Sequence, residues 1–338
     1  MTPIRVLVVD DSAFARKVLR ESLARSPRLQ VVGVARDGLE ALEKIAELKP
    51  DVVTLDLVMP NLDGLGVLHA LPPGGPRVVV VSISDAESAL GVEALQSGAV
   101  DLVHKPTALA TERLYDLGAE LTGKVVAAAA AHPRPAAGPV APLQIARRQG
   151  GVRLLVIGTS TGGPAALTQL LPAFPADFPA AVAVALHIPA GYTEALARRL
   201  DEICAVRVFE AFPGAELVPG SVAIARGGLH LKIGADGASI RAALDSRPVT
   251  APFCPSVDVL FESAAASLGP AVLGTVLTGM GDDGVEGAGA IRRAGGSVLT
   301  EAESSCVVYG MPRAVVEAGQ SDGVAPLETL AAEIGRRL

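Results

Sequence analysis

The sequence has few cysteines, and it lacks a long apolar run. Its three cysteines, Cys204, Cys254 and Cys306, are odd in number, far apart and without C-x-x-C spacing. This pattern fits neither a disulfide framework nor a zinc site, and it indicates a reducing compartment. No apolar stretch is long enough to cross a bilayer, and the first one ends at two aspartates, unlike a signal peptide. We therefore expect a cytoplasmic protein without membrane insertion.

Basic charge is also scarce. The formal net charge is −7. Residues 1–124 hold 13 basic and 17 acidic side chains, a balance of −4, and the remainder holds 16 and 19, a balance of −3. Neither part has the basic excess of a nucleic-acid-binding surface, so we expect no nucleic-acid partner.

The chain is long enough for two domains, and the first alternates strands with helices. Its 338 residues allow each domain its own core. Apolar strands are expected at 4–9, 29–35, 52–56, 77–83 and 99–103. This alternation predicts a parallel sheet covered by helices on both faces.

Polar groups gather where these strands end. Asp10 and Asp11 follow the first strand, Asp56 closes the third, Ser82 lies at the end of the fourth and Lys105 follows the fifth. Ligands of such sheets bind at the carboxyl ends of the strands. Three carboxylates meeting there would repel each other, which predicts a hard cation such as Mg²⁺. A single aspartate of this kind is usually a turn or cap residue, but five groups at matching ends predict a site.

Residues 4–124 resemble the receiver domain of bacterial response regulators. The resemblance rests on Val8-Val9-Asp10-Asp11-Ser12, Leu55-Asp56, Met59-Pro60, Asp63-Gly64 and Lys105-Pro106. It implies that Asp56 accepts a phosphoryl group from a histidine kinase, and that Ser82 and Lys105 contact the phosphate. It further implies an Mg²⁺ site made by Asp10, Asp11, Asp56 and the backbone carbonyl of Val58, with Asp10 acting mainly through water.

Two positions depart from the receiver pattern. Val58 stands where polar or acidic side chains are common, although only its backbone carbonyl is needed. Leu102 stands where many receivers carry a switch aromatic. The departure at Leu102 argues against an aromatic rotamer switch in this chain.

Composition changes between the two domains. Residues 127–131 are all alanine, and four prolines follow by residue 142. An Ala/Pro-rich stretch of this kind predicts a semi-rigid linker. We therefore expect a first domain at 1–124, a linker at 125–150 and a second domain at 151–338.

A glycine-rich turn opens the second domain. The stretch 158–164, Gly-Thr-Ser-Thr-Gly-Gly-Pro, follows an apolar run and predicts a sharp turn from a buried strand into a helix. Gly158 and Gly162 flank Ser160 in a G-x-S-x-G pattern, which can hold an exposed serine hydroxyl near a helix N-terminus. The alternatives are a capped glycine turn and a phosphate-binding loop, because short glycine motifs are weak signals.

The rest of this domain again alternates strands and helices. Helices are expected at 167–171, 193–200 and 257–268, and strands at 180–186, 272–277 and 297–300. A hairpin is expected within 216–233, from segments 216–220, 222–225 and 230–233. We predict a doubly wound, mostly parallel α/β domain with a β-hairpin.

Two histidines remain as possible general bases for Ser160, because the other three lie in the first domain and the linker. His187 follows a buried strand at the same sheet edge as Ser160. His230 lies in the expected hairpin, and we interpret it as a surface or structural residue. An acid should orient the imidazole, and spacing does not decide between Asp282 and Asp283 after strand 272–277.

These residues make the second domain resemble the CheB family of chemotaxis methylesterases, over residues 154–325. The matching runs are Ile157 to Pro164, His187-Ile188-Pro189, Pro255-Ser256-Val257-Asp258, Leu277 to Gly284 and Gly310-Met311-Pro312. The family triad maps onto Ser160, His187 and Asp283. Backbone N–H groups near Thr161 and Met280 are candidates for the oxyanion hole. Departures at Thr159, Leu186 and Phe253-Cys254 concern the fit of the substrate more than the triad.

The resemblance implies a phosphorylation-regulated enzyme. Its reaction is the hydrolysis of γ-glutamyl methyl esters on the cytoplasmic helices of chemoreceptors, releasing methanol without a cofactor, and some members deamidate receptor glutamines. Two alternatives stay open: a receiver-controlled hydrolase or amidase for a small ester or amide, and a non-enzymatic adaptor that docks on receptors.

Overall fold

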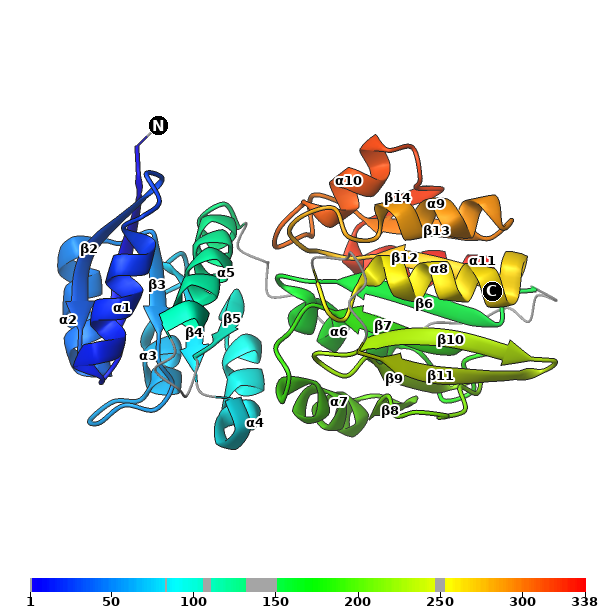
Figure 1. Cartoon of the computed structure of the whole chain (residues 1–338), viewed down its shortest axis with the longest axis horizontal. Helices are drawn as coiled ribbons and strands as arrows, with labels where there is room; N and C mark the ends of the chain where they lie inside the picture. Colours follow the sequence, from blue (N-terminus) through cyan, green and yellow to red (C-terminus); the bar gives the residue numbers. More distant parts are fainter. Residues whose placement is uncertain (1, 83, 106–110, 132–150, 247–252) are drawn as a thin grey trace. The chain divides into compact units, whose positions relative to one another are not determined.

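The chain forms two compact units. The computed structural model describes residues 2–82, 84–105, 111–131, 151–246 and 253–338. The units are Met1–Pro133 and Arg134–Leu338, and each is a layered α/β domain (Figure 1). Within the described ranges, no helix is both long enough and apolar enough to cross a membrane.

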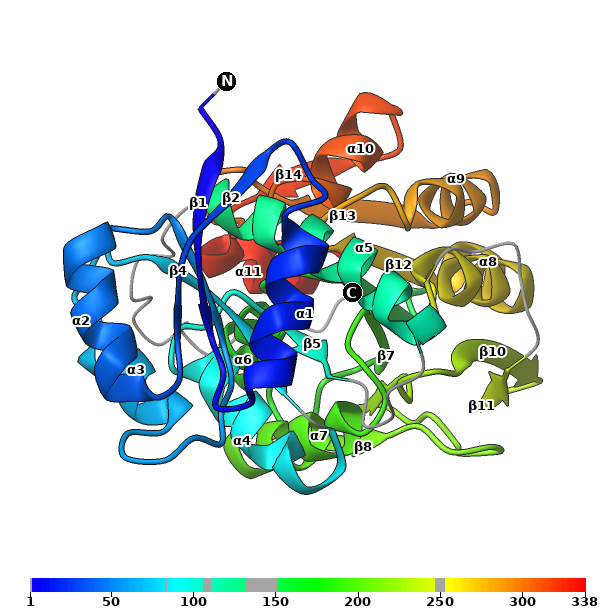
Figure 2. The ribbon, with the colours of Figure 1, turned by 60° about the vertical axis from the view of Figure 1, so that its left-hand side comes forward.

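The first unit is a five-stranded parallel sheet with the order β2-β1-β3-β4-β5. Its strands are β1 (Ile4–Val9), β2 (Leu29–Ala35), β3 (Val52–Leu55), β4 (Arg77–Ser82) and β5 (Asp101–His104). Its helices are α1 (Ala13–Leu23), α2 (Gly38–Leu48), α3 (Gly64–Ala70), α4 (Ser84–Gln96) and α5 (Thr111–Ala129). Helices α1 and α5 pack together on one face, and α2 and α3 pack on the other (Figure 2). The predicted (βα)5 receiver fold is confirmed.

Capping side chains shape the loops at the carboxyl edge of this sheet. Ser12 and Asp63 precede α1 and α3, and each side chain accepts the backbone N–H three residues later. Such caps bind N–H groups that have no partner within the helix. Because these loops follow β1 and β3, the caps also shape the edge that carries Asp10, Asp11 and Asp56.

The last helix of this unit is longer than expected. We predicted that a linker begins at residue 125, but α5 continues to Ala129, and both Val125 and Ala128 are fully buried. Alanine is the best helix former, so an alanine run next to a helix can extend it. The remaining linker residues, 132–150, lie outside the described residues.

The second unit contains a seven-stranded parallel sheet with the order β14-β13-β12-β6-β7-β9-β8. Its strands are β6 (Leu154–Thr159), β7 (Ala181–Leu186), β8 (Arg207–Glu210), β9 (Ser221–Ile224), β12 (Val272–Val276), β13 (Ser297–Glu301) and β14 (Gly323–Ala325). Its α-helices are α6 (Gly163–Leu170), α7 (Tyr192–Ile203), α8 (Val257–Leu268), α9 (Val285–Arg293), α10 (Met311–Glu317) and α11 (Leu327–Arg337).

The order of the strands places a switch point in the middle of this sheet. From β6 the chain builds outward on one side through β7, and it later returns to place β12 on the other side of β6. Open α/β sheets bind ligands where the strand order reverses, outside the carboxyl ends of the strands. The loops after β6 and β12 lie at this point.

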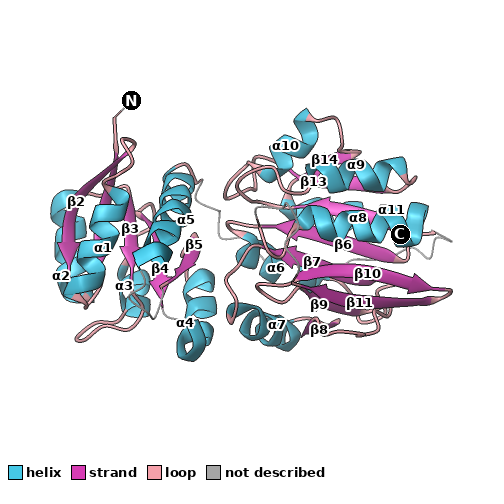
Figure 3. Cartoon of the chain, in the orientation of Figure 1, coloured by secondary structure: helices cyan, strands magenta, loops and turns pink. Residues whose placement is uncertain are grey.

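A hairpin is present, and of the predicted segments 230–233 lies in it, whereas 216–220 and 222–225 do not. It consists of β10 (His230–Asp236) and β11 (Ser239–Asp245), which pair antiparallel (Figure 3). Gly237 takes a positive φ of 57° in its turn, and Asp-Gly is a strong hairpin signal that our prediction overlooked. Segment 222–225, which we had placed in the hairpin, lies largely in the buried strand β9 (Ser221–Ile224), between β7 and β8.

Candidate active site and phosphorylation site

Three adjacent strands bring the predicted triad to one edge of the second sheet. Thr159 of β6 pairs with Leu186 of β7, so Ser160 and His187 each follow the same register position. The main chain also connects them, because the His187 N–H donates to the Thr159 carbonyl at 3.2 Å. Asp283 follows β12, which pairs with β6 on its other side.

Ser160 occupies a tightly constrained turn. Its N–H donates to the Thr278 carbonyl at 3.1 Å, and its own carbonyl accepts from the Gly163 N–H at 2.7 Å. Gly162 has a φ of +80°, and a Cβ there would lie 2.6 Å from Cβ of Val307. Only glycine fits this position, and it lets the chain turn directly into α6, whose N-terminus lies beside Ser160.

His187 forms a hydrogen bond to Asp283. Its Nε2 lies 2.7 Å from Oδ2 of Asp283, and its ring stacks on Phe253 with centroids 4.2 Å apart. An ionised carboxylate only accepts hydrogen bonds, so this contact places the imidazole proton on Nε2 and leaves the Nδ1 lone pair available. Nδ1 is buried and has no hydrogen-bond partner in the described part of the chain.

Ser160 and His187 are neighbours without a hydrogen bond between them. The Ser160 residue is buried, with 9% of its surface exposed, and no hydrogen bond from its hydroxyl to a described residue is present. Catalytic hydrogen bonds are often long without substrate and tighten in the complex. The structure therefore brings the imidazole and the acid into contact and places the nucleophile on the adjacent strand end.

Four donors saturate the Asp283 carboxylate. Besides His187, it accepts from Ser256 Oγ at 3.0 Å, from the Val257 N–H at 2.7 Å and from the Asp258 N–H at 3.0 Å. Burial favours its neutral form, but the hydrogen bond and charge of His187 and the backbone donors outweigh burial and lower the pKa of Asp283. The charged carboxylate is therefore available to hold His187.

The structure separates the two candidate acids that spacing left open. Asp283 is buried, whereas the preceding Asp282 is exposed. The side chain in contact with His187 is that of Asp283.

Sequence reasoning missed the residues that hold this acid. Ser256 caps α8 by accepting the Val259 N–H and also donates to Asp283. The run Pro255 to Asp258 was noted as part of a resemblance but was given no role. A serine before an apolar helix is a capping signal, but nothing in it points to a partner 27 residues away.

A second buried acid supports the nucleophile loop. Glu301 at the end of β13 is fully buried and accepts from the Thr278 N–H at 2.8 Å and from Ser305 Oγ at 2.9 Å. Thr278 in turn accepts from the Ser160 N–H through its carbonyl. No motif in the sequence indicated this glutamate.

The two residues predicted for the oxyanion hole, Thr161 and Met280, lie in the loops that follow β6 and β12. Thr161 is buried, and its carbonyl accepts from Thr278 Oγ1 at 3.0 Å. Met280 is half-buried, and its N–H makes no hydrogen bond to any described residue. Their role stays a prediction.

His230 is structural, in line with our interpretation. It is buried, and its Nδ1 accepts from the Ser256 N–H at 3.3 Å. Burial, reinforced by the nearby Lys232 charge, lowers the pKa of His230. The neutral ring therefore helps to fix the start of α8.

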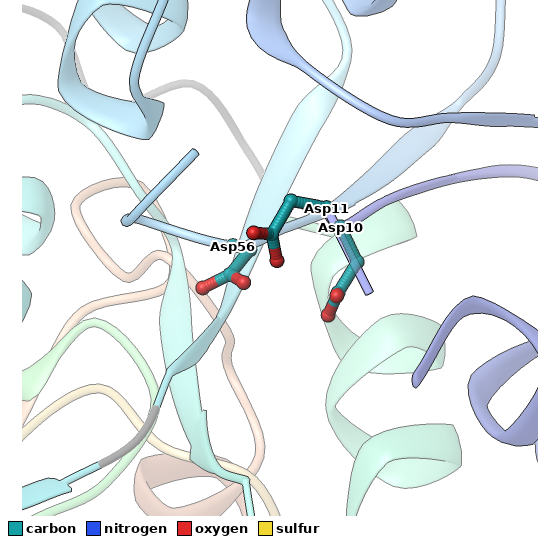
Figure 4. A group of neighbouring side chains, drawn as sticks. All are labelled: Asp10, Asp11 and Asp56. Atoms are coloured by element: carbon teal, nitrogen blue, oxygen red, sulfur yellow. The ribbon is translucent and has the colours of Figure 1, made fainter. Parts of the chain in front are cut away.

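In the first unit, the three predicted aspartates form a compact group. Ligand oxygens of Asp10, Asp11 and Asp56 all lie within 4.8 Å of one another (Figure 4). Lys105 Nζ lies 2.6 Å from Asp10 Oδ2 and 2.7 Å from Asp56 Oδ2. Carboxylate oxygens grouped in this way suit Mg²⁺, which prefers hard oxygen ligands.

One lysine faces two buried carboxylates. Burial raises the pKa of Asp56 even though Lys105 opposes the shift. For Lys105, burial favours the neutral amine, but Asp56 and Asp10 outweigh it and raise its pKa. The group therefore has an excess of negative charge that a bound cation would balance.

Three further receiver residues singled out in the sequence differ in their surroundings. Ser82 is buried at the end of β4, and its carbonyl accepts from the Lys105 N–H at 2.7 Å. The Val58 residue is half exposed, which suits a position where only a backbone carbonyl was predicted to act. Leu102 is fully buried, and its carbonyl accepts from Lys124 Nζ at 2.6 Å.

Together, fold and sites define a response regulator whose second domain is an α/β enzyme. Residues 155–334 match the CheB methylesterase family, and residues 6–115 match the response regulator receiver domain family. The chain therefore belongs to the CheB methylesterase family, as the resemblance implied.

Curated relatives match the whole chain. A Myxococcus xanthus protein named protein-glutamate methylesterase/protein-glutamine glutaminase 5 is 63% identical over 344 aligned residues, covering 100% of this chain and 99% of the relative. A Symbiobacterium thermophilum protein with the same activities in its name is 47% identical, covering 99% and 97%. The crystal structure of the Thermotoga maritima CheB methylesterase catalytic domain is 37% identical with a TM-score of 0.54, covering 55% of this chain and 99% of that one.

Proposed function

We propose that this chain hydrolyses glutamate γ-methyl esters of chemoreceptors, with release of methanol, and that it deamidates receptor glutamines. The observation that carries the proposal is the His187–Asp283 contact, which leaves the Nδ1 lone pair of His187 available beside the strand end that bears Ser160. Family membership and the activities named for the relatives identify the ester and the amide as substrates.

The reaction follows from this arrangement. Ser160 Oγ attacks the ester carbonyl while His187 Nδ1 takes the hydroxyl proton, and Asp283 stabilises the resulting imidazolium. His187 then delivers the proton to the departing methoxide, which leaves as methanol. Water, deprotonated by His187, releases the glutamate carboxylate. N–H groups near Thr161 and Met280 bind the oxyanion, and one such donor is typically worth ~3 kcal/mol.

We assign the control of esterase activity to the receiver domain. A histidine kinase phosphorylates Asp56, and Ser82 and Lys105 contact the phosphate. Asp10, Asp11, Asp56 and the Val58 carbonyl would hold Mg²⁺, which neutralises charge on the transferring phosphoryl group when bound. Phosphorylation adds about −1.5 to −2 charges, and we expect the modified receiver to increase turnover.

The test is methanol release from methylated receptor membranes, with and without a small-molecule phosphodonor. We expect release that increases with the phosphodonor and disappears in Ser160→Ala. Ser239→Ala, which changes an exposed hairpin hydroxyl bonded to Glu216, is the matched control. Turnover of small esters without receptor turnover would instead indicate a general hydrolase, and receptor binding without any turnover would indicate an adaptor.

A further inference from the structure

Two aspartates in the second unit cap each other's helices. The Asp283 carboxylate, just before α9, accepts the N–H groups of Val257 and Asp258 at the start of α8. Conversely, the Asp258 carboxylate in the first turn of α8 accepts the N–H groups of Gly284 at 2.9 Å and Gly287 at 2.7 Å, at the start of α9. We call this arrangement of Asp258 and Asp283 the crossed cap.

The crossed cap lies against the strand that leads to the nucleophile. A Cβ on Gly158, two residues before Ser160, would lie 2.2 Å from Val257 Cγ1. A Cβ on Gly284 would lie 3.0 Å from the same atom, and one on Gly287 would lie 3.1 Å from Asp258 Cα. The start of each helix and β6 are therefore in close contact.

We propose that Asp258 is a positioning residue for ester hydrolysis. By binding the N–H groups of Gly284 and Gly287, it fixes the loop that carries Asp283, and so holds the Asp283 carboxylate on His187 Nε2. The inference rests on the proposed function, because it assigns Asp258 to the same catalytic site. Asp258 acts through Asp283 and touches no reacting atom.

This role differs from that of an ordinary helix cap. A cap that acts on one helix changes stability and leaves the chemistry unchanged. Here the loop that Asp258 caps carries the catalytic acid, Asp283. Apart from His187, every hydrogen-bond partner of the Asp283 carboxylate lies at the start of α8. Loss of the Asp258 carboxylate frees the backbone after Asp283, while the Asp283 side chain stays bonded to the start of α8. The acid then shifts relative to His187. A misplacement of about 1 Å can cost up to about 100-fold in rate.

The test compares three variants of the full chain labelled with ¹⁵N-histidine. Asp258→Ala removes the acceptor, and Asp258→Asn keeps an oxygen for the two N–H groups. Ser267→Ala is the matched control, because it removes a hydrogen bond from the same helix to the Ile233 carbonyl, away from Asp283. The readouts are the imidazole Nε2–H signal of His187, assigned with His187→Gln, and kcat and KM for methanol release.

We expect Asp258→Ala to lose the His187 signal to exchange with water and to lower kcat by about 10-fold with KM within about twofold. Asp258→Asn should keep the signal and restore most of kcat, and Ser267→Ala should match the wild type in both. If Asp258→Ala does not fold, Asp258→Glu lengthens the side chain by one methylene and should show the same losses.

The proposal would be overturned if Asp258→Ala kept both the His187 Nε2–H signal and the kcat of the wild type. The same holds for Asp258→Glu if Asp258→Ala does not fold. Equal losses in Ser267→Ala would overturn it as well. A wild-type chain that releases no methanol would reject the proposed function, and the imidazole signal would still decide the role of Asp258.

Discussion

Asp56 and Asp283 are both buried aspartates at the carboxyl edge of a parallel sheet, but their surroundings differ. Asp56 shares one lysine with a second carboxylate, and burial raises its pKa. Asp283 receives four hydrogen bonds from His187, a serine hydroxyl and two backbone N–H groups, which outweigh burial and lower its pKa. The two carboxylates therefore show that the number of hydrogen-bond donors decides whether burial raises or lowers the pKa.

The most severe loss is expected at the nucleophile. Ser160→Ala should lower methanol release by about 10⁴-fold or more, because the members of a triad act as a unit. Phosphorylation of Asp56, followed by Phos-tag electrophoresis or radiolabel, should be unchanged, since it depends on the other domain. Release within tenfold of the wild type would remove Ser160 from its role.

The next effect separates the two neighbouring acids. Asp283→Asn should lower kcat by about 10³- to 10⁴-fold, because the amide no longer favours the imidazole tautomer with its proton on Nε2. The exposed Asp282→Asn should remain within about twofold. Equal losses in the two variants, or near-normal kcat in Asp283→Asn, would contradict the assignment of the acid.

Regulation should depend on Asp56 alone among the loop acids that follow β3. In Asp56→Asn, the ratio of activity with and without phosphodonor should fall to about one, since an amide cannot accept the phosphoryl group. Asp63→Asn, which retains an oxygen to cap α3, should keep the wild-type ratio. Stimulation of Asp56→Asn to the wild-type ratio would reject the proposed control.

The smallest effect concerns stability and pH. Burial, reinforced by the Asp283 charge, raises the pKa of Asp258 to about 7 from 3.8. Between these values the unfolded chain releases a proton that the folded chain retains, so the free energy of unfolding falls as pH rises from 4 to 7. Asp258→Asn lacks this titration and should gain on the order of 2 kcal/mol relative to the wild type over that range, about half of the full shift, because solvent screens the partly buried side chain.

Urea unfolding at several pH values measures this difference. The groups that face Asp258 are Asp283 and, beyond it, His187, with His230 bonded to the adjacent Ser256. Asp283 has the opposite shift, so its contribution to stability is lost only as pH falls below about 4. A constant difference between Asp258→Asn and the wild type from pH 4 to 7 would contradict the raised pKa of Asp258.

Much of both folds could be predicted from local patterns. The apolar runs before Asp10, Asp56, Ser160 and His187 identified buried parallel strands, and the carboxyl ends of such strands share one edge. That rule was sufficient to group these residues from the sequence alone. The prediction failed at the hairpin, because segment 222–225 was assigned to it although most of that segment forms the buried strand β9.

Other features depended on contacts that the sequence does not display. Asp282 and Asp283 are equivalent by spacing, and only family resemblance or the contact with His187 distinguishes them. The role of Asp258 arises from N–H groups 26 and 29 residues away. The alanine run after Val125 has the composition of a linker, but burial against the receiver keeps it helical.

The proposed mechanism depends most on which nitrogen of His187 carries the proton. The ¹⁵N chemical shifts of the neutral His187 ring measure this directly in the full-length protein. We predict the tautomer with a proton on Nε2, bonded to Asp283, and a bare Nδ1 facing the nucleophile. A ring protonated on Nδ1, with Nε2 bare, would contradict the proposed base and the role of Asp283.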